Sequence, residues 1–297
     1  MNNFYSPLRY PGGKSSLRHI ISKILLINNI DDSNYYEPFA GGSGLGLYLL
    51  MNGFVSNIFL NDADVTIYSF WKSILENGEK FIERIRKTDI SIAEWKKQKA
   101  VISSLANHTL DEIGFATFFL NRCNRSGIIS YAGPIGGKNQ EGEWKIDVRF
   151  NKTDLIQRIK RIIKYKNRIF FYNLDAINFL KSKLPRGNQR KNVFVYIDPP
   201  YYNKGKSLYL NYYTNSDHKI LSSYIKRQKT LNWVMTYDNV QQIISLYGSF
   251  HIFEYSLKYS LQDKKEGKEI FITPHNLIIP NSNIIPRHDQ RPMILIK

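Results

Sequence analysis

The chain of 297 residues has a single cysteine, Cys123, which excludes an intramolecular disulfide and a metal site of paired cysteines. No apolar run reaches about 18 residues, the length that a membrane-spanning helix requires. The six histidines are scattered without a metal-binding spacing, so we expect no metal site. The amino-terminal segment lacks a charged stretch followed by an apolar one, so it is not a signal peptide. These absences favour a protein of the cytoplasm.

Acidic residues are scarce relative to basic ones, at 25 against 42, and the formal net charge is +17. Such a balance is typical of proteins whose partner is a polyanion, most often nucleic acid. A membrane surface is the alternative partner, but no lipidation signal supports it. Basic residues cluster between positions 152 and 191, where either a solvated face or a phosphate-binding surface fits the pattern.

Strand-like and helix-like segments alternate toward both ends of the chain, which indicates an α/β protein with a parallel sheet. The pattern predicts strands at 35–39, 55–60, 169–172, 193–197 and 232–236, and an antiparallel pair at 250–257 and 269–273. From about 65 to 150 the strand pattern stops and amphipathic helical segments take over. We interpret 66–152 as an inserted, mostly helical domain with a hairpin near 121–150. Residues 1–65 and 153–297 then form the main domain.

The most informative segment is the apolar run 193–197, which is followed by Asp198, Pro199, Pro200 and Tyr201. Because proline cannot donate to a sheet ladder, a buried parallel strand must end there. Its carboxyl end then carries a carboxylate, rigid backbone carbonyls and an aromatic ring. That set suits a planar base with an exocyclic amino group. The alternative is a strand that only ends in a proline turn.

A glycine-rich turn at 41–46 follows the first predicted strand and precedes a helix. Glycine lets the backbone approach a ligand at a helix N-terminus, although Leu47 breaks the dinucleotide-binding fingerprint. Asp62 ends the next strand about twenty residues later, where a carboxylate commonly binds ribose hydroxyls. Asp175 ends the strand at 169–172, where it could accept from an adenine amino group. Either aspartate could instead cap a helix.

Two further segments carry candidate chemistry. Residues 9–15 look like a P-loop but have Leu8 where its first glycine belongs, although Lys14 could still reach a carboxylate or a phosphate. The stretch after position 121 has arginine and asparagine side chains of the kind that read base edges in a major groove. The candidate DNA-contacting residues are Arg122, Asn124, Arg125, Ser126, Tyr131 and Lys138.

Taken in order, these motifs resemble the Dam-like (D12 class, alpha-group) adenine-specific DNA methyltransferases. The resemblance covers nearly the whole chain and rests on RYPGGK at 9–14, YEPFAGGSG at 36–44, LNDAD at 60–64, NR at 121–122, SG at 126–127, DVRFNK at 147–152 and DPPY at 198–201. It implies a Rossmann-like methyltransferase sheet with an inserted target-recognition domain. It also implies S-adenosylmethionine as the methyl donor and double-stranded DNA as the substrate.

The resemblance further implies a set of cofactor-binding residues. These are Tyr10, Lys14, Glu37, Pro38, Phe39, Gly41, Gly42, Ser43, Gly44, Asp62, Asp175 and Asp198. Within this set, Lys14 and the segment 37–44 would surround the methionine part of the cofactor. Asp62 would bind its ribose, and Asp175 would bind its adenine.

The target adenine would be flipped out of the duplex, because its amino group is otherwise buried in the base stack. Asp198 and the carbonyl of Pro199 would accept hydrogen bonds from that amino group, Pro200 would stiffen the turn, and Tyr201 would stack on the base. A cognate restriction endonuclease acting on the same site is a candidate partner, and we expect a monomer.

Two other readings stay open at this point. An enzyme of the same fold could methylate RNA or a glutamine amide in a protein, because Asp-Pro-Pro-Tyr serves any planar amino group. A non-catalytic DNA-binding relative is the second reading.

Overall fold

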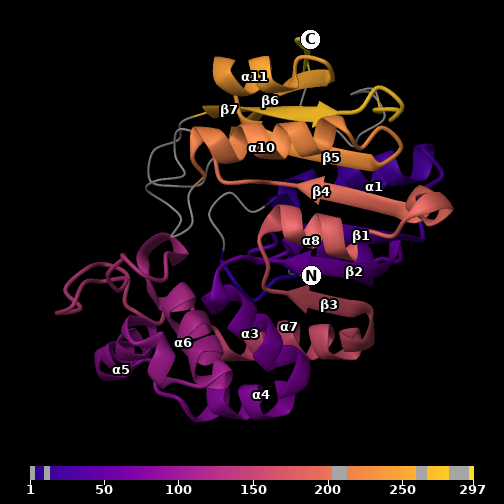
Figure 1. The fold of residues 1–297 in the computed structure, drawn as a ribbon. Coiled ribbons are helices and arrows are strands. Elements are labelled where there is room, and N and C mark those ends of the chain that lie inside the picture. Colours follow the sequence, from indigo (N-terminus) through magenta and orange to yellow (C-terminus); the bar gives the residue numbers. More distant parts are fainter. Residues whose placement is uncertain (1–3, 10–13, 203–212, 259–265, 281–293) are drawn as a thin grey trace.

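The computed structural model describes residues 4–9, 14–202, 213–258, 266–280 and 294–297. These residues form one mixed sheet with helices on both faces, and a helical region lies beside the β3 edge of the sheet (Figure 1). The strands are β1 (Ser33–Glu37), β2 (Val55–Asn61), β3 (Ile169–Tyr172), β4 (Val193–Ile197), β5 (Asn232–Asp238), β6 (His251–Lys258), β7 (Glu266–Thr273) and β8 (Ile294–Leu295).

The order of the strands across the sheet is β3-β2-β1-β4-β5-β7-β6-β8. Strands β1 to β5 pair in parallel, whereas β7 lies antiparallel between β5 and β6. The strand order reverses between the neighbours β1 and β4. In doubly wound sheets, ligands bind outside the carboxyl ends of the strands at such a switch point. The predicted Rossmann-like α/β fold is confirmed, and the glycine turn after β1 and Asp198 after β4 flank its switch point.

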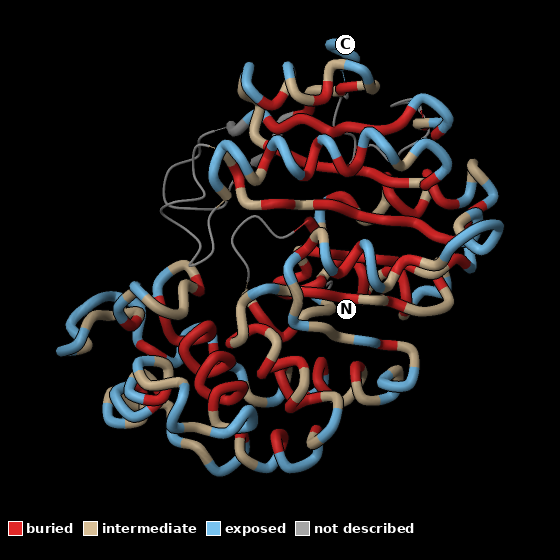
Figure 2. The backbone as a smooth tube through the Cα atoms, viewed as in Figure 1, coloured by how far each residue is buried: buried red, intermediate tan, exposed pale blue. Residues whose placement is uncertain are grey.

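Helices cover both faces of the sheet, and in Figure 2 the buried backbone runs along the strands between them. One face packs against α1 (Arg18–Ile27) and α2 (Gly44–Met51), and the other against α8 (Ala176–Lys183), α10 (Asn215–Lys226) and α11 (Gln241–Tyr247). Strand β4 serves both layers, because Phe194 and Tyr196 point to the first face and Val193, Val195 and Ile197 to the second. A continuous apolar run is what a strand buried on both faces requires.

The helical region consists of α3 (Val65–Glu76), α4 (Gly78–Lys87), α5 (Ile92–Ser103), α6 (Leu110–Cys123) and α7 (Lys152–Lys164). Short 3₁₀ helices occur at η1 (Lys14–Leu17), η2 (Leu105–Asn107), η3 (Arg125–Gly127), η4 (Lys166–Arg168) and η5 (Gly187–Asn192). Helix α6 begins at a capping box in which the side chains of Thr109 and Glu112 bind each other's backbone N–H. Where we predicted a hairpin near 121–150, the described residues contain no paired strands, only an isolated antiparallel bridge between Asn124 and Pro134.

The helical region and the sheet share one hydrophobic cluster. Trp71 of α3 stacks on Phe171 of β3 with ring centroids 5.4 Å apart, and its indole donates to the carbonyl of Gly41 at 2.9 Å. The proposed insert therefore packs its first helix directly against the glycine turn. The division at 66 and 152 stays a prediction.

Strand β1 lies two residues earlier than predicted, at 33–37 instead of 35–39. The reason is Pro38, which has no N–H to donate, so the ladder ends at Glu37. None of the helices in the described ranges combines the length and the apolar character needed to cross a bilayer.

Candidate active site at the carboxyl edge of the sheet

Asp198 lies where β4 ends, and two residues bind one of its oxygens. Thr236 of β5 donates to Oδ1 at 2.8 Å, and the Lys14 ammonium lies 3.1 Å from the same atom. A hydroxyl has a single proton, so Tyr196 must donate to Thr236 Oγ1, which lies 2.9 Å from the Tyr196 hydroxyl. Within the described part of the chain, side chains bind this carboxylate through Oδ1 only.

Lys14 begins η1 and is 6% exposed. Its ammonium donates to the hydroxyl of Tyr201 at 2.5 Å, lies 4.9 Å from the centroid of that ring, and lies 3.6 Å from Glu269 Oε2. Burial lowers the pKa of Lys14, but the carboxylates of Asp198 and Glu269 raise it by more, so the net pKa lies above the ordinary value. The four side chains form the Lys14 cluster: Lys14, Asp198, Tyr201 and Glu269.

Burial raises the pKa values of Asp198 and Tyr201. The pKa of Asp198 is raised by burial, with Lys14 acting against the shift and Glu269 adding to it. The pKa of Tyr201 is raised well above its usual range by burial and by the same two carboxylates. Tyr201 therefore keeps its proton and donates it to Glu269.

A second pair of acids, Glu37 at the end of β1 and Asp62 after β2, contacts the glycine turn. Ser43, at a left-handed φ of 40°, donates its hydroxyl to Glu37 Oε2 at 2.6 Å. The N–H of Gly41 donates to Asp62 Oδ2 at 2.9 Å, which ties the ends of β1 and β2 together. A Cβ on Gly44 would lie 2.4 Å from Ser15 Oγ but 3.8 Å from Ser15 Cβ, so a side chain there would require the Ser15 hydroxyl to rotate away.

The remaining residues of this turn have structural contacts of their own. The carbonyl of Pro38 accepts from the side chain of Asn61 at 3.0 Å. Phe39 meets Tyr213 edge to face with centroids 5.5 Å apart. Gly42 is buried within the turn.

Glu37 and Asp62 are poorly neutralised. Burial raises the pKa of Glu37 to about 8 and that of Asp62 to about 7, the latter with a contribution from Asp64. Among the described residues, no basic side chain forms an ion pair with either carboxylate. An ammonium group and ribose hydroxyls would supply the missing donors. The two carboxylates therefore fit a ligand that carries both kinds of donor, as S-adenosylmethionine does.

Two other predicted cofactor residues, Asp175 and Tyr10, are not seen to join this group of side chains. Asp175 is exposed and caps α8, accepting from the N–H groups of Ile177 and Asn178 at 3.0 Å each. It therefore takes the capping role that the sequence left open. Asp62 does not cap α3, because Asp64 does. Tyr10 lies outside the described residues.

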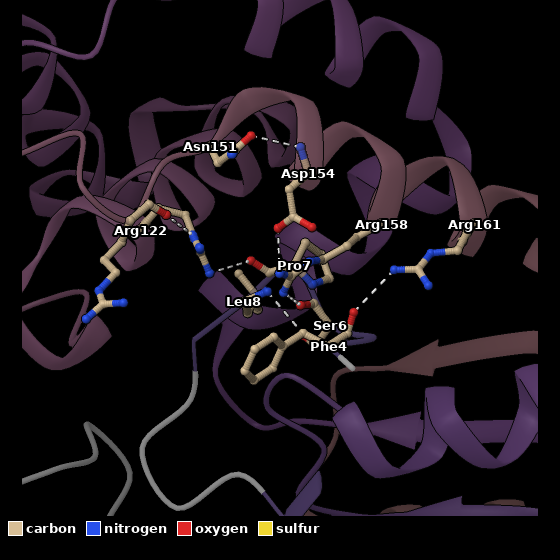
Figure 3. A network of polar contacts seen from close by, with 10 residues as sticks. Phe4, Ser6, Pro7, Leu8, Arg122, Asn151, Asp154, Arg158 and Arg161 are labelled. Atoms are coloured by element: carbon tan, nitrogen blue, oxygen red, sulfur yellow. Dashed lines mark hydrogen bonds and ion pairs between the residues drawn. The ribbon is translucent and has the colours of Figure 1, made fainter. Parts of the chain in front are cut away.

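The structure turns two of the predicted DNA-contacting residues inward. Arg122 donates to the carbonyls of Arg149 at 2.8 Å and Pro7 at 3.4 Å, as Figure 3 shows. Asn124 is fully buried, donates to the carbonyls of Ile128 and Ile129, and accepts from the Trp95 indole. Both side chains bind groups of the protein itself in this structure, so their placement lends no support to the prediction that they read bases.

The other predicted DNA-contacting residues lie at the surface. Arg125, Tyr131 and Lys138 are exposed, Tyr131 by 79%, and Ser126 is half-buried. In Figure 1 the segment between η3 and α7 projects to the side toward which the arrowheads of β3 and β4 point. These residues keep their polar groups available to a partner.

Three arginines of the basic cluster at 152–191 bind main-chain carbonyls, and one of them, Arg158, is buried. Arg158 donates to the carbonyl of Ser6 at 2.9 Å and Arg161 to that of Phe4 at 3.2 Å (Figure 3). Arg168 binds the carbonyls of Val55 and Ser56. These arginines anchor main chain, so the net charge overstates the basic surface.

Sequence reasoning missed several residues that complete the site. Thr236, Tyr255 and Glu269 lie on β5, β6 and β7, and nothing in their local pattern indicates a site. Asn121 of α6 binds both the N–H and the carbonyl of Arg9, each at 2.7 Å, and so anchors the segment that leads to Lys14. A search of the described residues finds no group of His, Cys, Asp or Glu side chains that could hold a metal ion.

A sequence model described as the D12 class N6 adenine-specific DNA methyltransferase family matches residues 10–261. No curated protein matches the chain. Among solved structures, a conserved hypothetical protein of Streptococcus pyogenes is 11% identical, with 86% of this chain and 96% of that one covered and a TM-score of 0.34.

Two further structures show a similar degree of likeness. TrmK of M. capricolum, in complex with the cofactor product S-adenosyl-homocysteine, is 9% identical, covers 85% of this chain and 68% of its own, and gives a TM-score of 0.34. A protein of Legionella pneumophila strain Philadelphia 1 is 11% identical, with coverages of 90% and 85% and a TM-score of 0.33. Superpositions this loose carry no functional argument.

Proposed function

The chain belongs to the D12 class N6 adenine-specific DNA methyltransferase family, and on this premise we propose that Asp198, Pro199, Pro200 and Tyr201 form its catalytic segment. The family fixes the reaction as methyl transfer to the N6 atom of adenine in DNA, with S-adenosylmethionine as the cofactor. RNA and protein glutamine, which the sequence alone left open, are thereby set aside. The finer statements below concern the residues that perform this reaction.

The carboxylate of Asp198 is the group that activates the target. The lone pair of the adenine amino nitrogen is delocalised into the ring, which makes it a poor nucleophile. Hydrogen bonds to Asp198 and to the carbonyl of Pro199 favour a pyramidal nitrogen and localise that lone pair. Positive charge develops on the nitrogen during transfer, and the nearby carboxylate stabilises it. The observation that supports this role is the binding of Asp198 Oδ1 by Thr236 and Lys14, which would leave Oδ2 for the substrate.

Tyr201 supplies a stacking surface for a base that has left the duplex. Its ring is 7% exposed and Lys14 binds its hydroxyl, so the surrounding side chains must move before a base can stack on the ring. Replacing the target adenine by 2-aminopurine tests this step, because the fluorescence of that base rises when it leaves the stack and falls when an aromatic ring covers it. Tyr201→Ala should raise the fluorescence of the bound complex above that of the wild type.

We propose the following roles for the cofactor residues. S-adenosylmethionine supplies an electrophilic methyl group on a sulfonium. Glu37 would bind the ammonium of its methionine part, Asp62 its ribose hydroxyls, and Lys14 with the turn of Gly41, Gly42, Ser43 and Gly44 would enclose the methionine part. Pro38 and Phe39 would line this pocket. Asp175 can serve the adenine only through the oxygen that does not cap α8.

Duplex DNA would bind across the carboxyl edge of the sheet and the region 66–152, which we propose as the target-recognition insert. The exposed Arg125, Tyr131 and Lys138 and the half-buried Ser126 are the candidates for contact. Binding of a fluorescent duplex should weaken steeply as ionic strength rises, because phosphate contacts release counterions. A flat salt response would contradict the proposal.

The central test is methyl transfer from labelled cofactor to duplex DNA, single-stranded RNA and a protein mixture in parallel. Transfer to duplex DNA alone, with N6-methyladenine recovered after digestion, is the expected result. Transfer to RNA or protein in preference to DNA would overturn the assignment. Sequencing of modified bases in DNA from an expressing host would then give the recognition site.

We further propose that the enzyme acts as a monomer in the cytoplasm, beside a restriction endonuclease that cuts the same site. Light scattering should give the 34.7 kDa mass of one chain, and modified host DNA should resist one endonuclease encoded nearby. A dimer mass, or DNA that stays sensitive, would contradict the respective statement.

A further inference from the structure

Glu269 reaches the carboxyl edge of the sheet because β7 runs against its neighbours. The parallel strands β4 and β5 end at this edge, whereas the antiparallel β7 begins there. Glu269 pairs in register with Asp238 of β5 and with Tyr255 of β6. A residue early in β7 therefore meets the turn that carries Asp198 and Tyr201.

Both oxygens of the Glu269 carboxylate accept hydrogen bonds from tyrosines. Tyr201 donates to Oε1, and Tyr255 donates to Oε2 at 2.6 Å. The residue is 1% exposed, and a carboxylate this deeply buried persists only where it is paired and hydrogen-bonded. Because an apolar side chain of similar size would be easier to bury, the arrangement points to a role beyond packing.

Lys14 lies between two carboxylates, 3.1 Å from Asp198 and 3.6 Å from Glu269. When the amino group of a target base binds Asp198, the ammonium stays buried and needs another anionic partner. Glu269 can be that partner after a small movement of the Lys14 side chain. The hydrogen bond that Glu269 accepts from the Tyr201 hydroxyl also fixes the position of that ring relative to Asp198.

We propose that Glu269 is a positioning residue for methyl transfer. It keeps Lys14 paired while Asp198 receives the adenine amino group, and it holds the ring of Tyr201 by its hydroxyl. This inference rests on the function proposed for Asp198 and Tyr201 at the same site.

The test is Glu269→Gln, which keeps the shape of the side chain but removes its charge and one acceptor oxygen. The single-turnover rate of transfer to duplex DNA should fall about 10- to 100-fold. The dissociation constant of S-adenosylmethionine, measured by calorimetry, should change by less than about threefold, since Glu269 is not among the proposed cofactor ligands. The acidic limb of the pH–rate profile should move to lower pH, because the charge of Glu269 contributes to the raised pKa of Asp198.

A double-mutant cycle with Tyr201→Phe separates positioning from a general loss of stability. That variant removes the hydroxyl that Glu269 holds, so the losses should not multiply. The product of the two single losses should exceed the loss of the double variant by at least about fivefold. Independent, multiplicative losses together with an unmoved pH profile would overturn the inference.

Three controls keep the outcome decisive. Glu254→Gln on β6 changes a glutamate that pairs with Lys268 at 2.8 Å outside the cluster, and it should leave the rate unchanged. If Glu269→Gln does not fold, Tyr255→Phe loosens Glu269 without removing charge and should slow transfer in the same direction, by about threefold; an unchanged rate there also overturns the inference. Asp198→Ala must be inactive in the same assay. Activity in Asp198→Ala would refute the proposed function. If Asp198→Ala is inactive but Glu269→Gln transfers methyl groups at the wild-type rate, only this inference is refuted.

Discussion

The carboxyl edge of the sheet and the end of α6 are both rich in polar side chains, yet they use them in opposite ways. At the sheet edge, Lys14, Asp198 and Glu269 face one another across distant parts of the chain. At the end of α6, Asn121 and Asn124 bind main-chain groups of nearby loops.

The two regions differ in how much hydrogen-bonding capacity their side chains have left. Asn124 donates twice and accepts once, so its amide has little left for a base. Asp198 is held through Oδ1, and Glu37 and Asp62 form no ion pair within the described residues. Buried carboxylates with unused capacity and raised pKa values are typical of a binding site, whereas amides whose groups are all paired are typical of a structural role.

The strongest way to break this contrast is Asp198→Ala. We expect the transfer rate to fall by about 10³-fold, because the charge that stabilises the reacting nitrogen is lost. Cofactor affinity, measured by calorimetry, should stay within a few-fold, since Glu37 and Asp62 remain. Near-normal turnover would remove Asp198 from the catalytic role.

The second contrast is between two neighbours, Arg125 and Asn124. Arg125→Ala should weaken duplex binding by about 5- to 100-fold, as measured by fluorescence anisotropy, and leave stability nearly unchanged. Asn124→Ala should lower the free energy of unfolding by about 1–3 kcal/mol, because it leaves buried partners unpaired. Urea unfolding measures this loss. A reversed pattern, with Asn124→Ala stable but defective in binding, would restore Asn124 as a base reader.

The pH dependence of cofactor binding sharpens the description of the second acidic pair. Glu37 and Asp62 have pKa values raised to about 8 and about 7, so each must lose a proton before it binds a cationic or hydroxyl donor well. Affinity should therefore rise with pH and level off above about pH 9, with a loss of about 10- to 20-fold between pH 8.5 and 7.0. Calorimetry in buffers of different ionisation enthalpy should detect proton release on binding at pH 7. Affinity that is flat across this range would mean that neither acid is a ligand.

The smallest expected effect comes from Thr236→Val, which keeps the shape but removes the hydroxyl that orients Asp198. The transfer rate should fall by about three- to tenfold, with little change in cofactor affinity. The buried position makes Thr236→Ser the matched control, because serine retains the donor. Equal losses in both variants would assign the effect to packing rather than to the hydrogen bond.

Much of the main domain could be predicted from local pattern. The run 193–197 followed by two prolines fixes both the strand and its end, since proline cannot extend the ladder. Strand β1 ends two residues earlier than predicted, because Pro38 ends its ladder in the same way. The apolar pattern on which the prediction rested does not show this limit. The inward turn of Arg122 and Asn124 could not be foreseen, because their partners are carbonyls of loops whose path the sequence does not reveal.

By itself the sequence determined the α/β order of elements, the strand ends just before Asp62 and Asp198, and the family. These features depend on short-range rules of periodicity and backbone chemistry. Only the tertiary structure showed that Thr236 and Glu269 lie beside Asp198 and Lys14 and that Asp175 caps a helix. The physical reason is strand direction: an antiparallel β7 brings Glu269 from the far end of the chain to the edge where β4 and β5 stop, and no local pattern records that meeting.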